Sequence, residues 1–481
     1  MRPLRERDAL GLTQGIQVTL VESLTAIYGV GVVALFASGR VDLLLAGILL
    51  GGPVVLALAL LRPAWTILVL VALPPSVTSA VPTRLLIVFM AAALFGFVLQ
   101  GGLHLWSGTG IYPLVGIIVL AFATKAAVPA EATAAADEIL KSIIYFTLVM
   151  LVAFNAMANG RIRIDSFVNA LLLGIVVSAV LQPFLAASLS FESIDISPFR
   201  GKFAYLAAMG FGVAYVRLSL NRSEGRRRSR LDAFLALAFL CLTSIGFGRA
   251  AWIATLWIFA LVSRWTRRKT FWLVASLSLL IVFTVPIVAE RINPVSDADV
   301  GTEATLDQVT SGRSELWADL WNRGVEAMPM GQGWGYIWSL TPMDIFGFET
   351  FVTGGNPLVY PHNDFLYVFV ELGIVGFGLL AVFWLTLFQR VRRLTRSPRE
   401  PIRYSVMVLV PVLIVMLMVQ MFDNGFVIDF VADRFFAAAG LVFGLYYSTR
   451  EGPRVGPQMD RPRASWRGPQ SPATRANVGE R

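Results

Sequence analysis

The sequence predicts an all-α polytopic membrane protein, and three observations lead to this fold class. Only 15% of the 481 residues are charged and 56% are hydrophobic, whereas soluble domains carry about 25% charged residues. Apolar runs long enough to cross a hydrocarbon core, about 17–25 residues each, recur along most of the chain, as at 41–61 and 271–289. Arginines cluster in the short links between these runs. We expect about 12 to 14 transmembrane helices.

The distribution of the net charge of +9 indicates how the chain is oriented. Basic residues concentrate in four segments: 221–230, 264–269, 390–403 and the tail after residue 449. Short basic links mark the cytoplasmic side of a membrane protein, so we assign this charge to orientation and membrane lipids and expect no nucleic-acid partner. If all four segments are cytoplasmic, the alternation of spans places the acidic link 128–138 and the long link 290–361 on the outer face.

The expected organisation is a transmembrane helical bundle over 1–449, with 290–361 as a large periplasmic loop within it. The segment 450–481, rich in Pro, Arg, Gly and Ser, is expected to be a disordered cytoplasmic tail. Within the large loop, one stretch has apolar residues at helical spacing, which predicts a short amphipathic helix on the bundle or at the interface. These residues are Leu316, Trp317, Leu320, Trp321 and Val325.

Four cationic residues fall where helices on the outer face are expected to begin: Arg200, Arg249, Arg313 and His362. A helix N-terminus carries roughly +0.5 of an elementary charge, so a cation there is unfavourable unless an anion joins it. A diphosphate suits such a place, because it accepts both backbone N–H groups and forked guanidinium donors. Two ordinary interpretations stay open: an arginine near the end of a span usually reaches lipid phosphates, and a histidine at a helix start is often structural.

A series of motifs in this region resembles one known family. Arg249 begins a span and is followed by "SGRSELW" at 311–317, "MPMGQGWGY" at 328–336 and "HNDFLYVFVELGIVGFGLL" at 362–380. Their order and spacing are similar to the signature region of the O-antigen ligase/polymerase superfamily, which comprises bacterial inner-membrane glycosyltransferases that use lipid-linked sugars. The resemblance covers approximately residues 200–450, including "FRGKFAYLAAMG", and extends to the first half only in hydropathy.

The resemblance implies a role for each cationic residue. His362 matches the catalytic base that takes the proton from the acceptor hydroxyl. Arg249 and Arg313 match the arginines that hold the diphosphate of an undecaprenyl-diphosphate-linked glycan, with Arg200 as a further candidate. The sugar would be transferred with inversion, at a site facing the periplasm, without a metal or other cofactor. Gly248 stands where many members have serine, so one local hydroxyl contact is missing.

The glycines of "GQGWG" at 331–335 lack the preceding strand of a dinucleotide fingerprint and are interpreted as a tight turn beside the site. Trp334, Tyr336 and Asn363 are candidate sugar contacts, with anchoring at the membrane interface as the alternative for the aromatic residues. No His, Cys or Asp cluster has the spacing of metal ligands, so no metal site is predicted.

The predicted function is transfer of a glycan from undecaprenyl diphosphate to a sugar hydroxyl at the periplasmic face, in O-antigen or exopolysaccharide assembly. The long outer loop favours a polymerase, with the alternatives of a ligase acting on the lipid A core and of a protein O-oligosaccharyltransferase. A transporter or lipid-glycan flippase is the alternative from another class, suggested by many spans and charges in or near apolar runs such as Lys125. Transporters usually show related halves, which are not apparent here.

Overall fold

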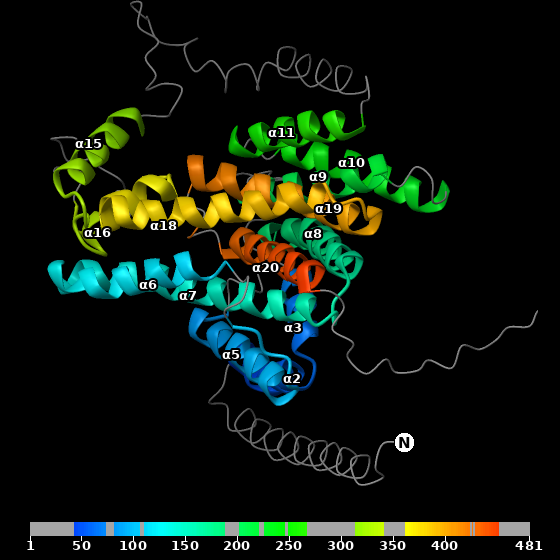
Figure 1. Ribbon diagram of the computed structural model, residues 1–481, viewed down its shortest axis with the longest axis horizontal. Helices are drawn as coiled ribbons and strands as arrows, with labels where there is room; N and C mark the ends of the chain where they lie inside the picture. The colour runs from blue at the N-terminus through cyan, green and yellow to red at the C-terminus, as the bar shows by residue number, and fades with distance from the viewer. Residues whose placement is uncertain are drawn as a thin grey trace, which may run out of the picture.

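The computed structural model describes residues 43–73, 81–105, 110–187, 202–220, 226–245, 249–266, 313–340, 361–423, 426 and 429–451. These residues form helices and no strands, which confirms the all-α fold class (Figure 1). The helices are α2 (Leu43–Leu61), α3 (Pro63–Ala72), α5 (Thr83–Leu99), α6 (Tyr112–Thr124), the 3-10 helix η1 (Lys125–Ala127), α7 (Ala130–Ala158), α8 (Ile164–Ala187), α9 (Lys202–Leu220), α10 (Arg226–Ile245), α11 (Arg249–Thr266), α15 (Arg313–Glu326), α16 (Tyr336–Ser339), α18 (Asp364–Thr395), α19 (Glu400–Phe422) and α20 (Asp429–Glu451).

Four helices of the described chain are long and apolar enough to cross a membrane, namely 136–158 in α7, 203–220 in α9, all of α18 and all of α19. Shorter apolar helices accompany them. The chain is therefore a polytopic membrane protein, while the number of 12 to 14 spans stays a prediction. The expected span at 271–289, Arg200, much of the loop 290–361 and the tail from residue 452 lie outside the described residues.

The centre of the bundle is the contact between α7 and α20. Gly440 and Gly444 lie one turn apart on α20, and a Cβ added to either would come within 2.2 and 2.6 Å of the carbonyl oxygens of Met150 and Phe154, respectively. Small residues at this spacing let two helix backbones approach closely within a membrane, where dispersion contacts drive association. The Gly-x-x-x-Gly pattern on α20 thus fixes the core around which the other helices are arranged.

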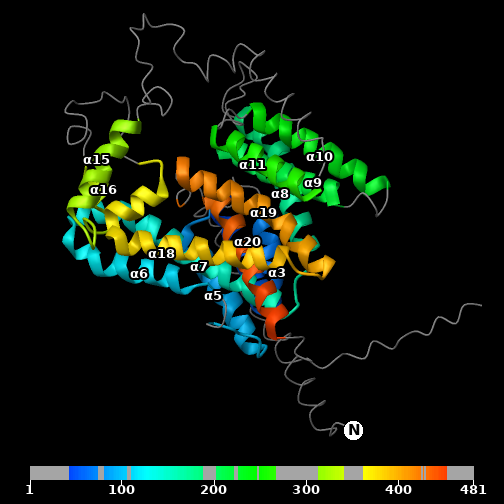
Figure 2. The same cartoon turned by 45° about the horizontal axis from the view of Figure 1, so that its top comes forward.

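The two ends of the bundle differ in chemistry. At one end, which we name the arginine end, Arg393 donates to the Tyr446 hydroxyl at 2.9 Å and Arg390 lies 3.9 Å above the Tyr446 ring. The opposite end, named the His362 end, holds the start of α18 together with α15 and α16 (Figures 1 and 2). This segregation agrees with the alternation of spans inferred from the basic links.

Two local features bear on the expectations from sequence. The amphipathic helix is present as α15, with Leu316 and Leu320 buried, but Trp321 and Val325 are exposed and Trp321 instead stacks on Phe369 of α18. The acidic link 128–138 is shorter than expected, because α7 begins at Ala130. The link is rich in alanine, the residue with the highest intrinsic helix propensity, so the helix extends beyond the apolar run.

Candidate functional site

His362 lies immediately before α18 in an unusual backbone conformation. Asn363 is the N-cap residue, and its side-chain oxygen accepts the N–H of Leu366 at 3.0 Å. His362 precedes this cap with φ +48°, the only positive φ of a non-glycine residue in the described chain. A side chain in this left-handed region costs on the order of 1–3 kcal/mol and is found preferentially at functional sites. The backbone thus holds this imidazole in place at an energetic cost.

The imidazole of His362 is one end of a polar relay that joins side chains from three parts of the chain. Its Nδ1 lies 3.2 Å from Oδ1 of Asp423, the residue that follows α19, and the Tyr205 hydroxyl of α9 donates to Oδ2 of Asp423 at 2.7 Å. An ionised carboxylate can only accept, so Nδ1 carries the hydrogen and Nε2 is left as the proton acceptor. The side chains of His362 and Asp423 are 36% and 25% exposed. This geometry suits a general base at the edge of the bundle.

A second carboxylate beside His362 has a structural partner. Asp364, the first helical residue of α18, is fully buried and accepts the backbone N–H of Phe426 at 3.0 Å. A negative charge at this position is stabilised by the helix N-terminus. Asp364 therefore fastens α18 to the turn after α19, and this turn also carries Asp423.

Helix α15 lies against the start of α18 and brings the position of Arg313 near the relay. The Trp317 indole N–H donates to the carbonyl oxygen of Pro361 at 2.6 Å, one residue before His362. Arg313, the first residue of α15, is four residues earlier, which is about 6 Å along a helix axis. The sequence prediction that Arg313 and His362 belong to one site is compatible with this arrangement.

A cavity of about 400 Å³ lies between α15 and α18. Its walls are almost entirely apolar and mainly aromatic, and Asn363 stands at its edge next to His362. The lining residues are Trp317, Ala318, Trp321, Asn363, Phe365, Leu366, Phe369 and Phe377.

Arg249, the first residue of α11, lies at the same end of the bundle as Tyr205. Asp232 of α10 pairs with Arg217 near the end of α9, and Phe239 farther along α10 packs against Gly210, so α9 and α10 run antiparallel. The C-terminal end of α10 is therefore level with the start of α9. Since α11 begins a few residues later, the backbone at Arg249 is on the side of the bundle where Tyr205 meets Asp423.

The glycine-rich turn 331–335 is held against α18 by a buried carboxylate. Gly331, Gly333 and Gly335 all have φ between +78° and +105°, as the predicted tight turn requires. Glu371 of α18 is fully buried and accepts the backbone N–H of Ile337 at 2.8 Å and that of Gly335. Glu371 thus fastens the glycine-rich turn to α18.

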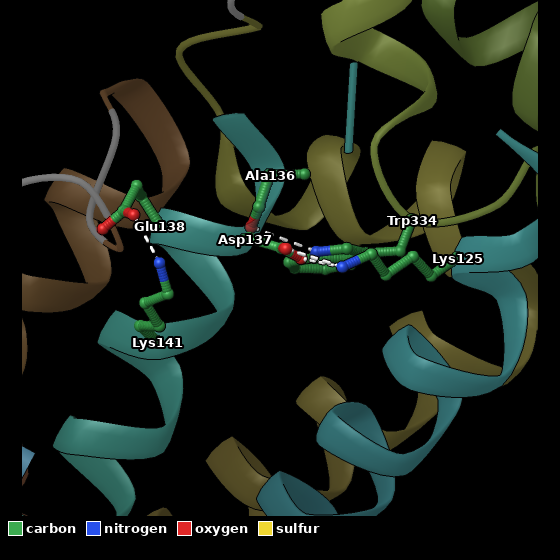
Figure 3. A network of polar contacts seen from close by, with 6 residues as sticks. All are labelled: Lys125, Ala136, Asp137, Glu138, Lys141 and Trp334. Atoms are coloured by element: carbon green, nitrogen blue, oxygen red, sulfur yellow. Dashed lines mark hydrogen bonds and ion pairs between the residues drawn. The ribbon is translucent and has the colours of Figure 1, made fainter. Parts of the chain in front are cut away.

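Trp334, a candidate sugar contact from the sequence, is buried in the structure and cannot face a sugar. Its side chain is fully buried, its ring packs edge-on against Tyr367, and its indole N–H donates to the carbonyl oxygen of Ala136 at 3.1 Å (Figure 3). It therefore has no exposed face for a sugar, because the turn inserts it between α7 and α18. Figure 3 also shows the pair of Lys125 and Asp137 next to Trp334. The Nζ of Lys125 lies 2.6 Å from Oδ2 of Asp137.

Tyr336 is half-buried, and its hydroxyl accepts from Arg323 of α15 at 3.0 Å. Arg323 also pairs with Asp319 at 2.7 Å. Burial lowers the pKa of the Arg323 guanidinium, but its hydrogen bonds with Asp319 and Tyr336 outweigh this and raise the pKa above its ordinary value. This arginine is therefore charged and engaged within the loop.

Sequence reasoning missed the partnership of His362 with Asp423 and Tyr205. The only available signal was that Asp423 follows an apolar run at the predicted outer face, and nothing in the sequence singled out Tyr205. Within the described ranges, no group of three or more His, Cys, Asp or Glu side chains has the arrangement of a metal site.

The fold and this site define a polytopic helical membrane protein with a histidine-centred polar site at one end of its bundle. Residues 233–381 match the family model described as O-antigen ligase. This part of the chain is thus similar to that family, which confirms the resemblance to the O-antigen ligase/polymerase superfamily seen in the sequence. The match indicates glycosyltransferase activity of this type. It includes Arg249, Arg313 and His362, whereas Tyr205 and Asp423 lie outside it. No curated protein matches the chain.

Proposed function

We propose that this protein transfers a glycan from undecaprenyl diphosphate to an acceptor hydroxyl at the periplasmic face of the bacterial inner membrane, in O-antigen or exopolysaccharide assembly. The observation that carries the proposal is the Tyr205–Asp423–His362 relay beside an aromatic cavity in a chain similar over residues 233–381 to the O-antigen ligase family. Placing the arginine end in the cytoplasm, as short basic links favour, puts His362 on the periplasmic side.

His362 acts as the general base. Nε2 takes the proton of the acceptor hydroxyl as its oxygen attacks the anomeric carbon of the donor sugar. The bond from that carbon to the diphosphate oxygen breaks, and polyprenyl diphosphate leaves with the bonding electron pair. Attack opposite the leaving group inverts the anomeric configuration. Asp423 holds the imidazole in the accepting tautomer and stabilises the imidazolium that forms, while Tyr205 fixes the carboxylate.

Arg313 and Arg249 hold the diphosphate, with Arg200 as a weaker addition. The leaving group gains charge as the glycosidic bond breaks, and a fixed donor aimed at such charge is worth about 3–4 kcal/mol in enzymes where it was removed. Arginine suits this role better than lysine, because its guanidinium is always charged and binds two oxygens at once. Support comes from the positions of α15 and α11, which begin at Arg313 and Arg249 on the side where His362 lies.

The cavity between α15 and α18 offers an apolar path for the first isoprene units of the carrier. Its aromatic wall includes Trp321, which is 54% exposed, and Asn363, the residue after the proposed base, also lines it. Asn363 uses its oxygen to cap α18, so its amide nitrogen is the group proposed to donate to a sugar hydroxyl. Tyr336 is the second proposed sugar contact.

The long loop 290–361 favours a polymerase, which uses another lipid-linked repeat unit as acceptor. A ligase would use the lipid A core instead, and a protein O-oligosaccharyltransferase would use a protein hydroxyl. The rival interpretation as a transporter or flippase loses support at Lys125, because this residue pairs with Asp137 at a helix end.

Wild-type protein in proteoliposomes tests the proposal, with a native polyprenyl-diphosphate-linked glycan as donor and each acceptor class in turn. Release of polyprenyl diphosphate together with glycan attached to one acceptor, in the presence of EDTA, supports metal-independent transfer and names the subclass. Protein-free liposomes are the control. Passage of intact lipid-linked glycan across the bilayer, without release of polyprenyl diphosphate, would establish the transporter instead.

A further inference from the structure

A second cavity, of about 340 Å³, lies at the arginine end, away from His362. It is formed where three parts of the chain meet: residues 61–65 at the turn between α2 and α3, Gln100 after α5, and Arg161 in the link between α7 and α8. We name it the Arg62–Arg161 cavity. The transfer mechanism uses none of its residues.

The charge of this cavity is not balanced within the described part of the chain. Neither the Arg62 nor the Arg161 guanidinium forms an ion pair or hydrogen bond with a described residue, and Arg161 lies 5.6 Å over the Phe97 ring. The nearest acidic residue in the sequence, Asp165 in the first turn of α8, faces Arg163 at 3.9 Å instead. Arg62 and Arg161 are both exposed residues, so an anion can reach them, and desolvation lowers the pKa of Arg161. An anion bound between them would balance their charge through charge-assisted hydrogen bonds.

The walls of the cavity are fixed by hydrogen bonds that do not use the arginines. The Gln100 amide nitrogen contacts the carbonyl oxygens of Leu60 and Leu61 at 3.4 and 3.3 Å, which ties the end of α2 to α5. Helix α3 begins at this cavity with Pro63 in its first turn and no side-chain cap. Its N-terminal partial charge adds to that of the two arginines.

We propose that the Arg62–Arg161 cavity binds a phosphate-bearing anion. The guanidinium groups approach from two different elements and can share the phosphate oxygens, as forked donors do. Trp65 lines the cavity and is 57% exposed, and Val98 and Leu99 near it on α5 are exposed apolar residues. Tryptophan beside exposed aliphatic residues is typical of the boundary between lipid and water. A phospholipid headgroup and a soluble phosphate offer the same chemistry to this site.

The test uses the full-length protein purified in detergent. Native mass spectrometry measures binding of phosphatidylglycerol and of zwitterionic phosphatidylcholine, and equilibrium dialysis measures binding of inorganic phosphate. The variants are Arg62→Gln/Arg161→Gln, the charge-retaining Arg62→Lys/Arg161→Lys, and Arg163→Gln as the matched control from the same link. Arg163 is suitable because its side chain is 84% exposed and outside the cavity.

We expect the glutamine pair to weaken phosphatidylglycerol binding at least ~10-fold, because two charge-assisted contacts are lost, while Arg163→Gln and phosphatidylcholine binding change little. The lysine pair should fall between, since it keeps the charge and loses the forked geometry. An arginine-dependent loss of inorganic phosphate binding alone would support the site with a soluble ligand. Equal affinities of the glutamine pair and Arg163→Gln for every probe would overturn the proposal. If the glutamine pair does not fold, two other comparisons test the proposal: the lysine pair against wild type, and phosphatidylglycerol against phosphatidylcholine on wild type. The proposal is overturned if the lysine pair binds every probe as wild type does, or if wild type shows no preference for phosphatidylglycerol.

Discussion

Replacing Asp423 with asparagine tests the relay most specifically. Asparagine keeps the size of the side chain but removes the charge that holds Nδ1–H of His362, so the imidazole is free to adopt the tautomer that cannot accept a proton at Nε2. A hydrogen bond to a charged group contributes about 1.5–3 kcal/mol, which corresponds to approximately 10- to 150-fold in rate. Because His362 and Asp423 are 36% and 25% exposed, solvent weakens the contact. We therefore expect kcat to fall about 10- to 100-fold with little change in KM.

The assay is the initial rate of polyprenyl diphosphate release in proteoliposomes at saturating donor. Asp165→Asn is the matched control, because it makes the same chemical change in an exposed side chain at the arginine end, and its rate should stay within about twofold of wild type. Thermal unfolding of both variants separates loss of catalysis from loss of the fold. An Asp423→Asn enzyme that turns over like Asp165→Asn would refute the positioning role.

Three further predictions follow from contacts at the His362 end. Tyr205→Phe removes the hydroxyl that fixes Asp423 and should lower kcat about 3- to 10-fold in the same assay, without changing the melting temperature. An unchanged rate would show that Tyr205 contributes only packing. Glu371→Ala leaves two backbone N–H groups of the glycine-rich turn without acceptors and should cost about 2–5 kcal/mol of stability, seen as earlier thermal unfolding in detergent; a melting curve like that of wild type would contradict this role. Gly373 has φ +63° at a kink in α18, and Gly373→Ala would place a Cβ 2.1 Å from the carbonyl oxygen of Pro329, so this variant should destabilise the protein. Gly378→Ala in the same helix, with open space around its Cβ, should not, and equal melting temperatures for the two would show that the kink tolerates a side chain.

The fold was predictable to the extent that it follows from local sequence. The apolar spacing around Leu316 and Leu320 correctly predicted helix α15, whereas the orientation inferred from the basic links stays a prediction. The environment of Trp321 was not predictable from local sequence, because its ring stacks on Phe369, 48 residues later in the sequence, and the side chain stays 54% exposed. The acidic link 128–138 was predicted too long, because hydropathy marks the membrane run and not the alanine-rich turns of α7 before it.

The candidate site was predictable only where a residue type was unusual for its position. His362 stood out as a histidine at a helix start, but its partners Asp423 and Tyr205 are 61 and 157 residues away in the chain, and no local pattern links them. Trp334 shows the opposite case. An aromatic residue in a predicted outer loop is a typical sugar contact, yet tertiary contacts with Ala136 and Tyr367 bury Trp334 completely.

The most direct test of the account is single-turnover transfer by purified His362→Ala beside wild type, with His104→Ala as the control. His104 is the only other histidine of the chain, and it packs against Tyr447 at the arginine end. The account predicts that His362→Ala transfers glycan about 100-fold more slowly or worse, as loss of a general base requires, while His104→Ala matches wild type. Equal transfer rates for His362→Ala and wild type would contradict it.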